Sequence, residues 1–382
     1  MDKKVTYAEA ILAEEIKVLE DSDGLNQRIL VAGNRSGGVA VAAMRRRPGA
    51  EVVAHAFDCH HARAIRKRLL DEGLPARNVR CSAGVGVEGT DALCPPEGTC
   101  PPYDLAFFMT TPQSMPAELV LDQLQDIHAN LKDGGVLYAA FEGSPDDALK
   151  TMKLVWKTVN VRRRAKHAIL FRATKRGAPA KERSFAANWE ASVPGGAPLA
   201  FTTYPGCFCH RRPDAGGLAL AEVAAREAKG ERPAKPDSPF AILDMGCGCG
   251  IVGLLVADAF RTFHPSPFAF RLSLIDSHAR AIAAAKANAA RAGIDAEFIL
   301  SDDGLPRGRV SEYDLFVGNP PYYSDYRIAE VFLETAYRAL KPGGICLTVV
   351  KTATGLLALQ EKYFRTAEVI KRRGYCVLRS IR

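Results

Sequence analysis

A glycine-rich turn is the segment best suited to bind a cofactor. Its sequence, Asp-Met-Gly-Cys-Gly-Cys-Gly at residues 244–250, follows an apolar run and precedes a helical pattern. Gly246, Gly248 and Gly250 let the backbone approach a ligand closely, and the helix that follows favours an anionic group at its amino end. Because Gly248-x-Gly250-x-x-Gly253 also fits a dinucleotide fingerprint, the glycines alone leave a nicotinamide cofactor and S-adenosylmethionine open.

Three carboxylates, one at this turn and two further along the chain, help to decide between these two cofactors. Asp244 lies two residues before the first glycine, where it can order the turn and receive an ammonium group through backbone or water. A pyrophosphate needs no acid there. Asp276 ends the next apolar run, at a distance suited to ribose hydroxyls, and Asp302 follows a further run, where it can accept the adenine amino group. Together with the turn, these acids predict S-adenosyl-L-methionine as the cofactor. The structural alternatives are a strand-end turn for Asp276 and a helix N-cap for Asp302.

A side-chain amide follows another apolar strand in Phe-Val-Gly-Asn-Pro-Pro-Tyr-Tyr, at residues 316–323. Asn319 is the amide, and Pro320 and Pro321 stiffen the turn after it. Pro320 also has no N–H group that could compete at the site. Tyr322 offers a ring for stacking on a base, a contact worth about 1–3 kcal/mol. The alternative is that the motif forms an ordinary proline turn. The position of the motif after the fourth strand favours a functional role.

The elements that must position these residues occur twice along the chain. Each half has an apolar run that ends in glycine, a second run that ends in Asp, and a Tyr-Asp-Leu strand start before a Gly-Gly turn. The landmarks Gly33, Asp104 and Gly135 recur as Gly246, Asp314 and Gly344, at offsets of 213, 210 and 209. Alternating strands and amphipathic helices predict an α/β fold of two tandem Rossmann-like domains, with mostly parallel sheets and helices on both faces. Ligands of such sheets bind beyond the carboxyl ends of the strands.

The expected domains are residues 1–175 and 201–382, joined by a linker at 176–200 that is rich in Gly, Pro, Ala and charge. Residues 94–102, rich in Pro and Gly between cysteines, are expected to form a loop inserted in the first domain. A second Gly- and Pro-rich stretch, residues 230–239, belongs to the connection between the halves.

The first domain lacks most of the site residues of the second. Val31 stands where Asp244 would be, and Met109-Thr110-Thr111-Pro112 replaces the Asn-Pro-Pro motif. Only Asp58 survives as an acid of the cofactor type. We therefore expect the first domain to be a degenerate copy that neither catalyses nor binds the cofactor, and that grips RNA, steadies the second domain, or does both.

Composition excludes several other classes of protein. The 382 residues are 47% hydrophobic but hold no apolar run of eighteen, and the amino end lacks a signal peptide, so a cytoplasmic protein without a membrane span is expected. The ten cysteines lack the paired spacing of structural zinc sites, so no metal is expected. The net charge is +8. Arg162, Arg163 and Arg164 are predicted to contact phosphates, the alternative being a solvated surface.

Asp-x-Gly-Cys-Gly combined with Asn-Pro-Pro-Tyr resembles the class I methyltransferases that modify planar amine or amide nitrogens. The resemblance implies seven-stranded sheets and a reaction at Asn319 and Pro320. The side-chain carbonyl of Asn319 and the backbone carbonyl of Pro320 would accept hydrogen bonds from the target NH₂ group. The methyl group would then transfer in line from the sulfonium, with positioning supplying most of the acceleration.

A degenerate domain before an intact one is similar to the bacterial ribosomal RNA guanine-N2 methyltransferases, over nearly the whole chain. Tyr-Pro-Gly-Cys-Phe at residues 204–208 looks like their Leu-Pro-Gly-Val-Phe segment. Tyr322 and Tyr323 depart from their usual Phe-His, which keeps a stacking ring but weakens the assignment of the base. The resemblance implies methylation of the N2 amine of a guanine in ribosomal RNA, with 16S small-subunit RNA favoured. The implied partner is ribosomal RNA or a subunit, and a monomer is favoured.

Four other functions remain open at this point. Protein-glutamine methyltransferases and adenine-N6 methyltransferases share the tetrapeptide, but the first carry a small helical domain and the second a target-recognition domain. A non-catalytic RNA-binding protein with a methyltransferase fold is disfavoured by the intact Asp244, Asp276, Asp302 and Asn319. A dehydrogenase would leave Asn319 without a role.

Overall fold

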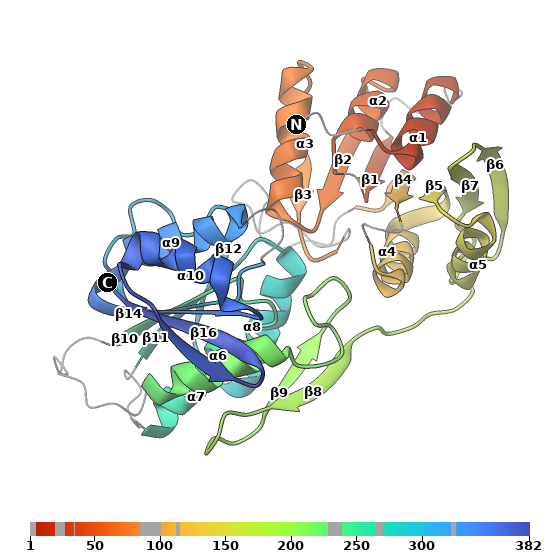
Figure 1. Cartoon of the computed structure of the whole chain (residues 1–382). Helices are drawn as coiled ribbons and strands as arrows, with labels where there is room; N and C mark the ends of the chain where they lie inside the picture. Colours follow the sequence, from red (N-terminus) through yellow and green to blue (C-terminus); the bar gives the residue numbers. More distant parts are fainter. Residues whose placement is uncertain are drawn as a thin grey trace. The chain divides into compact units, whose positions relative to one another are not determined.

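The computed structural model describes residues 5–19, 27–33, 35–84, 101–111, 115–227, 239–263, 270–321 and 326–382. The chain divides into two compact units, Met1–Phe185 and Ala186–Arg382, and Figure 1 shows strands covered by helices in each. Tyr322 and Tyr323 lie outside the described residues, as do residues 94–100 of the loop predicted at 94–102 and most of the stretch at 230–239.

Within the described residues, the first unit has one seven-stranded sheet in the order β3-β2-β1-β4-β5-β7-β6. Its strands are β1 (Arg28–Ala32), β2 (Glu51–Ala56), β3 (Val79–Cys81), β4 (Tyr103–Thr110), β5 (Leu131–Glu142), β6 (Val159–Arg164) and β7 (Ala168–Thr174). Its helices are α1 (Tyr7–Val18), α2 (Gly38–Arg46), α3 (Cys59–Asp71), α4 (Ala117–Asn130) and α5 (Pro145–Val155). Neighbouring strands are parallel, except that β7 is antiparallel to β5 and β6.

The second unit repeats this topology in its described residues, with the order β12-β11-β10-β13-β14-β16-β15. Its strands are β10 (Phe240–Met245), β11 (Phe270–Asp276), β12 (Glu297–Leu300), β13 (Tyr313–Gly318), β14 (Leu340–Val350), β15 (Glu368–Arg372) and β16 (Tyr375–Ile381). Its helices are α6 (Ala215–Glu227), α7 (Ile251–Phe263), α8 (Ala279–Ala292), α9 (Arg327–Ala339) and α10 (Ala353–Phe364). The predicted fold of two tandem, mostly parallel seven-stranded sheets is therefore confirmed.

Two apolar clusters, one on each face, hold the second sheet. Alternate residues of a strand point to opposite faces. On β10, Ile242 joins the cluster shared with α6, α7 and α8, whereas its neighbour Leu243 joins the cluster shared with α9 and α10. Both side chains are fully buried. Burial on both faces explains why β10 is apolar along almost its whole length, and it makes the single acid in that strand, Asp244, conspicuous.

The same hydrogen-bonding device recurs beside the first strand of each sheet. In the first unit, Asp104 accepts from the N–H group that opens β1 at 2.8 Å and from Lys132 Nζ at 2.6 Å. In the second, Asp314 accepts from an N–H group of β10 at 2.9 Å and from Lys341 Nζ at 2.8 Å. The strand pairing shifts register at these two acids, between β4 and β5 and between β13 and β14. The repeat in the sequence is thus a repeat of structural detail.

The linker between the units is shorter than the sequence predicted. Strands β8 (Ala187–Ala191) and β9 (Leu199–Thr203) form an antiparallel hairpin inside and just beyond the expected 176–200 linker. The buried Asn288 of α8 fixes this hairpin to the second unit, because its side chain accepts from Thr202 N at 2.8 Å and donates to Thr202 O at 3.1 Å. Gly and Pro in this segment form turns of a folded hairpin. Among the described residues, no helix is long and apolar enough to cross a membrane.

Candidate active site

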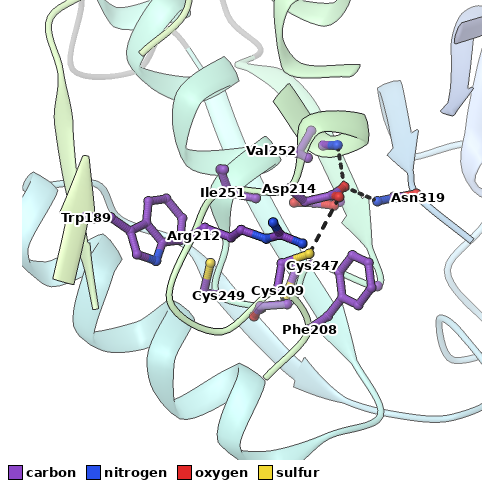
Figure 2. A pocket seen from close by; sticks show the side chains of 14 residues that line it. Trp189, Phe208, Cys209, Arg212, Asp214, Cys247, Cys249, Ile251, Val252 and Asn319 are labelled. Atoms are coloured by element: carbon purple, nitrogen blue, oxygen red, sulfur yellow. Dashed lines mark hydrogen bonds between the residues drawn. The ribbon is translucent and has the colours of Figure 1, made fainter. Parts of the chain in front are cut away.

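A pocket in the second unit lies beyond the carboxyl ends of β10 and β13, where open α/β sheets bind ligands. The hairpin, the segment before α6, the glycine turn and the end of β13 all contribute to it (Figure 2). Its lining residues are Trp189, Phe208, Cys209, Arg212, Asp214, Gly217, Asp244, Gly246, Cys247, Gly248, Cys249, Ile251, Val252 and Asn319. The structure therefore brings together four residues predicted from sequence, Asp244, Gly246, Gly248 and Asn319.

Asp244 connects the end of β10 to the first turn of α7. Its carboxylate is only 2% exposed and accepts from Gly253 N at 2.8 Å. Burial raises the pKa of Asp244 to about 7, since one hydrogen bond only partly replaces lost hydration. A side chain at Gly253 would force its neighbours to shift, because a Cβ atom would lie 2.6 Å from Leu274 Cδ2 and 3.0 Å from Asp244 Oδ2. The predicted role of Asp244 beside the cofactor's ammonium group stays a prediction.

The glycine turn holds a conformation that other residues rarely adopt. Gly246, Gly248 and Gly250 have φ values of +70°, +55° and +86°, in the left-handed region where only glycine is free of strain. The turn is also pinned to the neighbouring strand, because Ile275 O accepts from Gly246 N at 2.8 Å and from Cys247 N at 2.9 Å. A rigid turn with bare backbone is suited to close contact with a ligand.

Asp276 fastens the turn from the end of β11. One oxygen accepts from Gly248 N at 2.8 Å, and the other accepts from His278 N at 2.9 Å. The strand-end turn considered as an alternative role for Asp276 is therefore present. The predicted contact between Asp276 and the ribose stays a prediction. Asp302 lies two residues beyond the end of β12, the strand that pairs with β11. Neither acid, nor Gly250, lines the pocket itself.

Asn319 comes directly after β13 and is half-buried at the pocket. Its Nδ2 atom donates to Asp214 Oδ2 at 2.9 Å. The next residue, Pro320, is buried, and Pro321 is half-buried. The predicted stacking rings of Tyr322 and Tyr323 fall outside the described residues.

Six lining residues that precede the first strand of the second sheet were not predicted as site residues: Trp189, Phe208, Cys209, Arg212, Asp214 and Gly217. They lie in and after the hairpin. Phe208 stands at the pocket with 68% of its surface exposed. Asp214 did carry a local signal, because an acid directly before a helical pattern is a preferred N-cap. The structure shows that cap, with Gly217 N donating to Asp214 Oδ2 at 2.6 Å.

The pocket thiols are not poised as nucleophiles or ligands. Burial raises the pKa of Cys209 to about 11, that of Cys249 to about 12, and that of Cys247 well above its usual range. A thiol must lose its proton to attack or to bind metal, so these cysteines are neutral at physiological pH. Among the described residues, no three His, Cys, Asp or Glu side chains are grouped so as to hold a metal ion.

The arginine cluster lies on β6, at the edge of the first sheet. Arg162 Nε contacts Glu15 Oε1 at 2.6 Å, and Arg163 Nη1 contacts Glu14 Oε2 at 3.0 Å. Glu15 is 1% exposed, so it needs a cationic partner. Arg162 and Arg163 thus attach α1 to the sheet edge, and both Arg162 and Arg164 are exposed. The predicted phosphate contacts of these three arginines stay a prediction.

The corresponding loop of the first unit packs differently. Val31 is fully buried in the sheet. Gly33 lies so close to β4 that a Cβ atom would be 2.0 Å from Met109 O. Asp58, the surviving acid, caps α3 by accepting from His60 N at 2.8 Å. The apolar Val31 thus stands at the position where, in the second unit, Asp244 connects the strand to the next helix.

Comparison with known proteins gives concordant findings. Residues 198–379 match the family described as methyltransferase small domain. Ribosomal RNA small subunit methyltransferase C of Pseudomonas paraeruginosa is 33% identical over 187 residues, 47% of this chain and 50% of that protein. The chain thus spans about half the length of that relative. The same enzyme of Stutzerimonas stutzeri is 28% identical over 314 residues, 79% of this chain and 83% of that protein.

A solved structure has the same fold over nearly the whole chain. It is the T. thermophilus 16S rRNA N2 methyltransferase in complex with AdoMet and guanosine, with a TM-score of 0.69 at 20% identity. The match covers 97% of this chain and 92% of that one. The resemblance inferred from the sequence is confirmed: residues 198–379 match the methyltransferase small domain, and the two seven-stranded sheets have the fold of the T. thermophilus structure.

Proposed function

We propose that the chain transfers a methyl group from S-adenosylmethionine to the exocyclic N2 amine of a guanine in ribosomal RNA, with small-subunit 16S RNA as the favoured substrate. The observation that carries this proposal is the position of Asn319, whose amide lies at a pocket shared with the glycine turn. The names of the Pseudomonas and Stutzerimonas relatives and of the T. thermophilus structure support the choice of RNA and base.

The residues of the pocket fit S-adenosylmethionine. The bare backbone at Gly246 and Gly248 accommodates close contact, and the carboxylate of Asp244 suits a ligand with an ammonium and a sulfonium group. Asp276 and Asp302 are proposed for the ribose and the adenine, with Gly250 shaping the turn. When bound, the sulfonium supplies an electrophilic methyl group. The protein's own task is then to hold the acceptor nitrogen in line with it.

An exocyclic amine on a base is a poor nucleophile because its lone pair is delocalised into the ring. Two hydrogen-bond acceptors can draw its hydrogens out of the ring plane and localise the lone pair. We assign these roles to Asn319 Oδ1 and the carbonyl of Pro320, with Pro321, Tyr322 and Tyr323 contacting the base. No strong general base is needed, because the ammonium formed on transfer is acidic and loses its proton readily.

The first unit has no comparable role in the chemistry. We infer that residues 1–175 form a non-catalytic copy that binds RNA or steadies the catalytic domain at 201–382. The buried Val31 and the tight approach of Gly33 to Met109 support this. The guanine must leave its stack to reach Asn319, so an unpaired context lowers the cost of binding.

The test is methyl transfer from labelled S-adenosylmethionine to ribosomal RNA and to small subunits that lack native methylation. Asn319→Ala should lower the rate by about 100-fold, as when one preorganised hydrogen-bonding group is removed from an active site; Asn319 is also among the residues proposed to contact the cofactor. Asn130→Ala is the control, because the side chain of Asn130 donates to Asp126 within α4, in the first unit.

Mass spectrometry of the product decides between the functions. N2-methylguanosine that disappears in Asn319→Ala supports the proposal. Label on a protein glutamine, or on the N6 atom of adenine, would move the assignment to those methyltransferases. Cofactor binding without transfer to any of these substrates would refute the guanine assignment, and absence of cofactor binding would favour an RNA-binding protein without activity.

A further inference from the structure

One contact in the pocket joins residues that are 105 positions apart. Asn319 Nδ2 donates to Asp214 Oδ2 at 2.9 Å, and Figure 2 shows the two side chains pointing toward each other. Asp214 comes from the segment before α6, whereas Asn319 comes from the end of β13. This inference rests on the proposed function, in which Asn319 accepts a hydrogen bond from the target amine.

The chemistry of the two groups fixes which end of the amide faces Asp214. An ionised carboxylate can only accept hydrogen bonds, whereas an amide has a donating NH₂ end and an accepting oxygen end. At 2.9 Å from Asp214 Oδ2, the partner atom has to be the NH₂ nitrogen of Asn319. A flipped amide would set two acceptors against each other. The oxygen of Asn319 is therefore the end left for a ligand.

Asp214 is itself held rigidly at the start of α6. The same Oδ2 atom accepts from Gly217 N at 2.6 Å, and the backbone carbonyl of Asp214 accepts from Leu218 N at 2.9 Å. Its other oxygen accepts from Cys209 Sγ at 3.6 Å. The helix thus fixes the carboxylate, and the carboxylate fixes the amide. Such an arrangement is set before substrate arrives, which is what effective transition-state stabilisation requires.

We propose that Asp214 is a positioning residue for Asn319, which holds the amide so that Oδ1 faces the amine to be methylated. It acts through Asn319 and does not touch the substrate. A hydrogen bond from the NH₂ end to a carboxylate is charge-assisted and stronger than a neutral one. It also polarises the amide, which makes Oδ1 a better acceptor.

Two substitutions separate positioning from helix capping. Asp214→Ser keeps an oxygen that can cap Gly217 N, because Ser is a preferred N-cap, but its side chain is too short to hold Asn319. Asp214→Asn keeps the size and the cap, yet it can present either a donor or an acceptor to Asn319 and so no longer enforces one orientation. Ser144→Ala removes a comparable cap from α5 in the first unit, where Ser144 accepts from Asp147 N, and is the control for a lost cap.

The experiment measures single-turnover methylation of unmethylated ribosomal RNA, together with the KM for S-adenosylmethionine and the melting temperature. We expect the single-turnover rate of Asp214→Ser to fall about tenfold or more, since small misplacements of a catalytic group are costly, and Asp214→Asn to lie between it and the wild type. The KM for the cofactor should stay within about threefold. Ser144→Ala should keep the wild-type rate.

A wild-type rate in Asp214→Ser would overturn the inference while leaving the proposed function intact. A slower rate in Asp214→Ser and Asp214→Asn would also overturn it if both variants lost cofactor affinity by the same factor and melted at a lower temperature. The loss of the helix cap alone would then explain the effect. If the Ser variant does not fold, the Asn variant carries the same comparison. Absence of methyl transfer by the wild type would refute the proposed function and this inference together.

Discussion

Replacing Asp244 by Asn should remove most of a pH-dependent loss of stability in the cofactor-free protein. Burial raises the pKa of Asp244 from 3.8 to about 7, so between these values the folded protein binds more protons than the unfolded chain. Stability from this group is full below about pH 4 and is lost as pH rises through 7. One pKa unit corresponds to about 1.36 kcal/mol. Between pH 5 and pH 8 the carboxyl should therefore cost the wild type about 2.5 kcal/mol.

Urea unfolding at pH 5 and pH 8, followed by circular dichroism, measures this difference. The Asn side chain can still accept from Gly253 N but does not titrate, so Asp244→Asn should lose about 2.5 kcal/mol less than the wild type over this range. Asp295→Asn, which removes an exposed carboxyl from the same unit, should behave like the wild type. If Asp244→Asn and the wild type lose the same free energy, the buried carboxyl is not the source of the pH dependence.

Two further substitutions test the turn and the sheet edge. Asp276→Ala removes the acceptor for Gly248 N and the proposed ribose contact, so calorimetric titration should show S-adenosylmethionine binding about 10–100-fold weaker; unchanged affinity would leave Asp276 out of the cofactor site. Arg162→Ala leaves the buried Glu15 with a weaker partner. Because Arg162 is half exposed, we expect a loss of about 1 kcal/mol, seen as a melting temperature a few degrees lower in scanning calorimetry. An unshifted transition would show that the ion pair contributes nothing measurable.

Local patterns allowed the sequence to predict much of this molecule. The glycine turn, the acid before it and the motif at Asn319 each depend on neighbouring residues, and each lies at a strand end, where a parallel sheet gathers its functional groups. The repeat strengthened these predictions, because each repeated position of one half, such as Gly33, indicated the matching strand end in the other half, such as Gly246.

Contacts between distant residues could not be predicted in the same way. Asp214 and Asn319 are separated by 105 residues, and Arg162 and Glu15 by 147. Nothing in the local spacing of either pair indicates that the fold brings them together. The hairpin that ends at Thr203 was missed for a related reason, since the Gly and Pro that indicate a linker also form the turns of a paired segment.

The matching acids Asp104 and Asp314 have a consequence for the history of the chain. Both hold the start of a central strand and pair with a lysine, whereas the acid of the glycine turn survives only as Asp244, opposite Val31. Carboxylates that hold the strands are present in both halves, whereas the buried carboxylate before the glycine turn, which lines the pocket, is present in one. This is the pattern expected of a tandem gene duplication after which a single copy stayed under selection for chemistry.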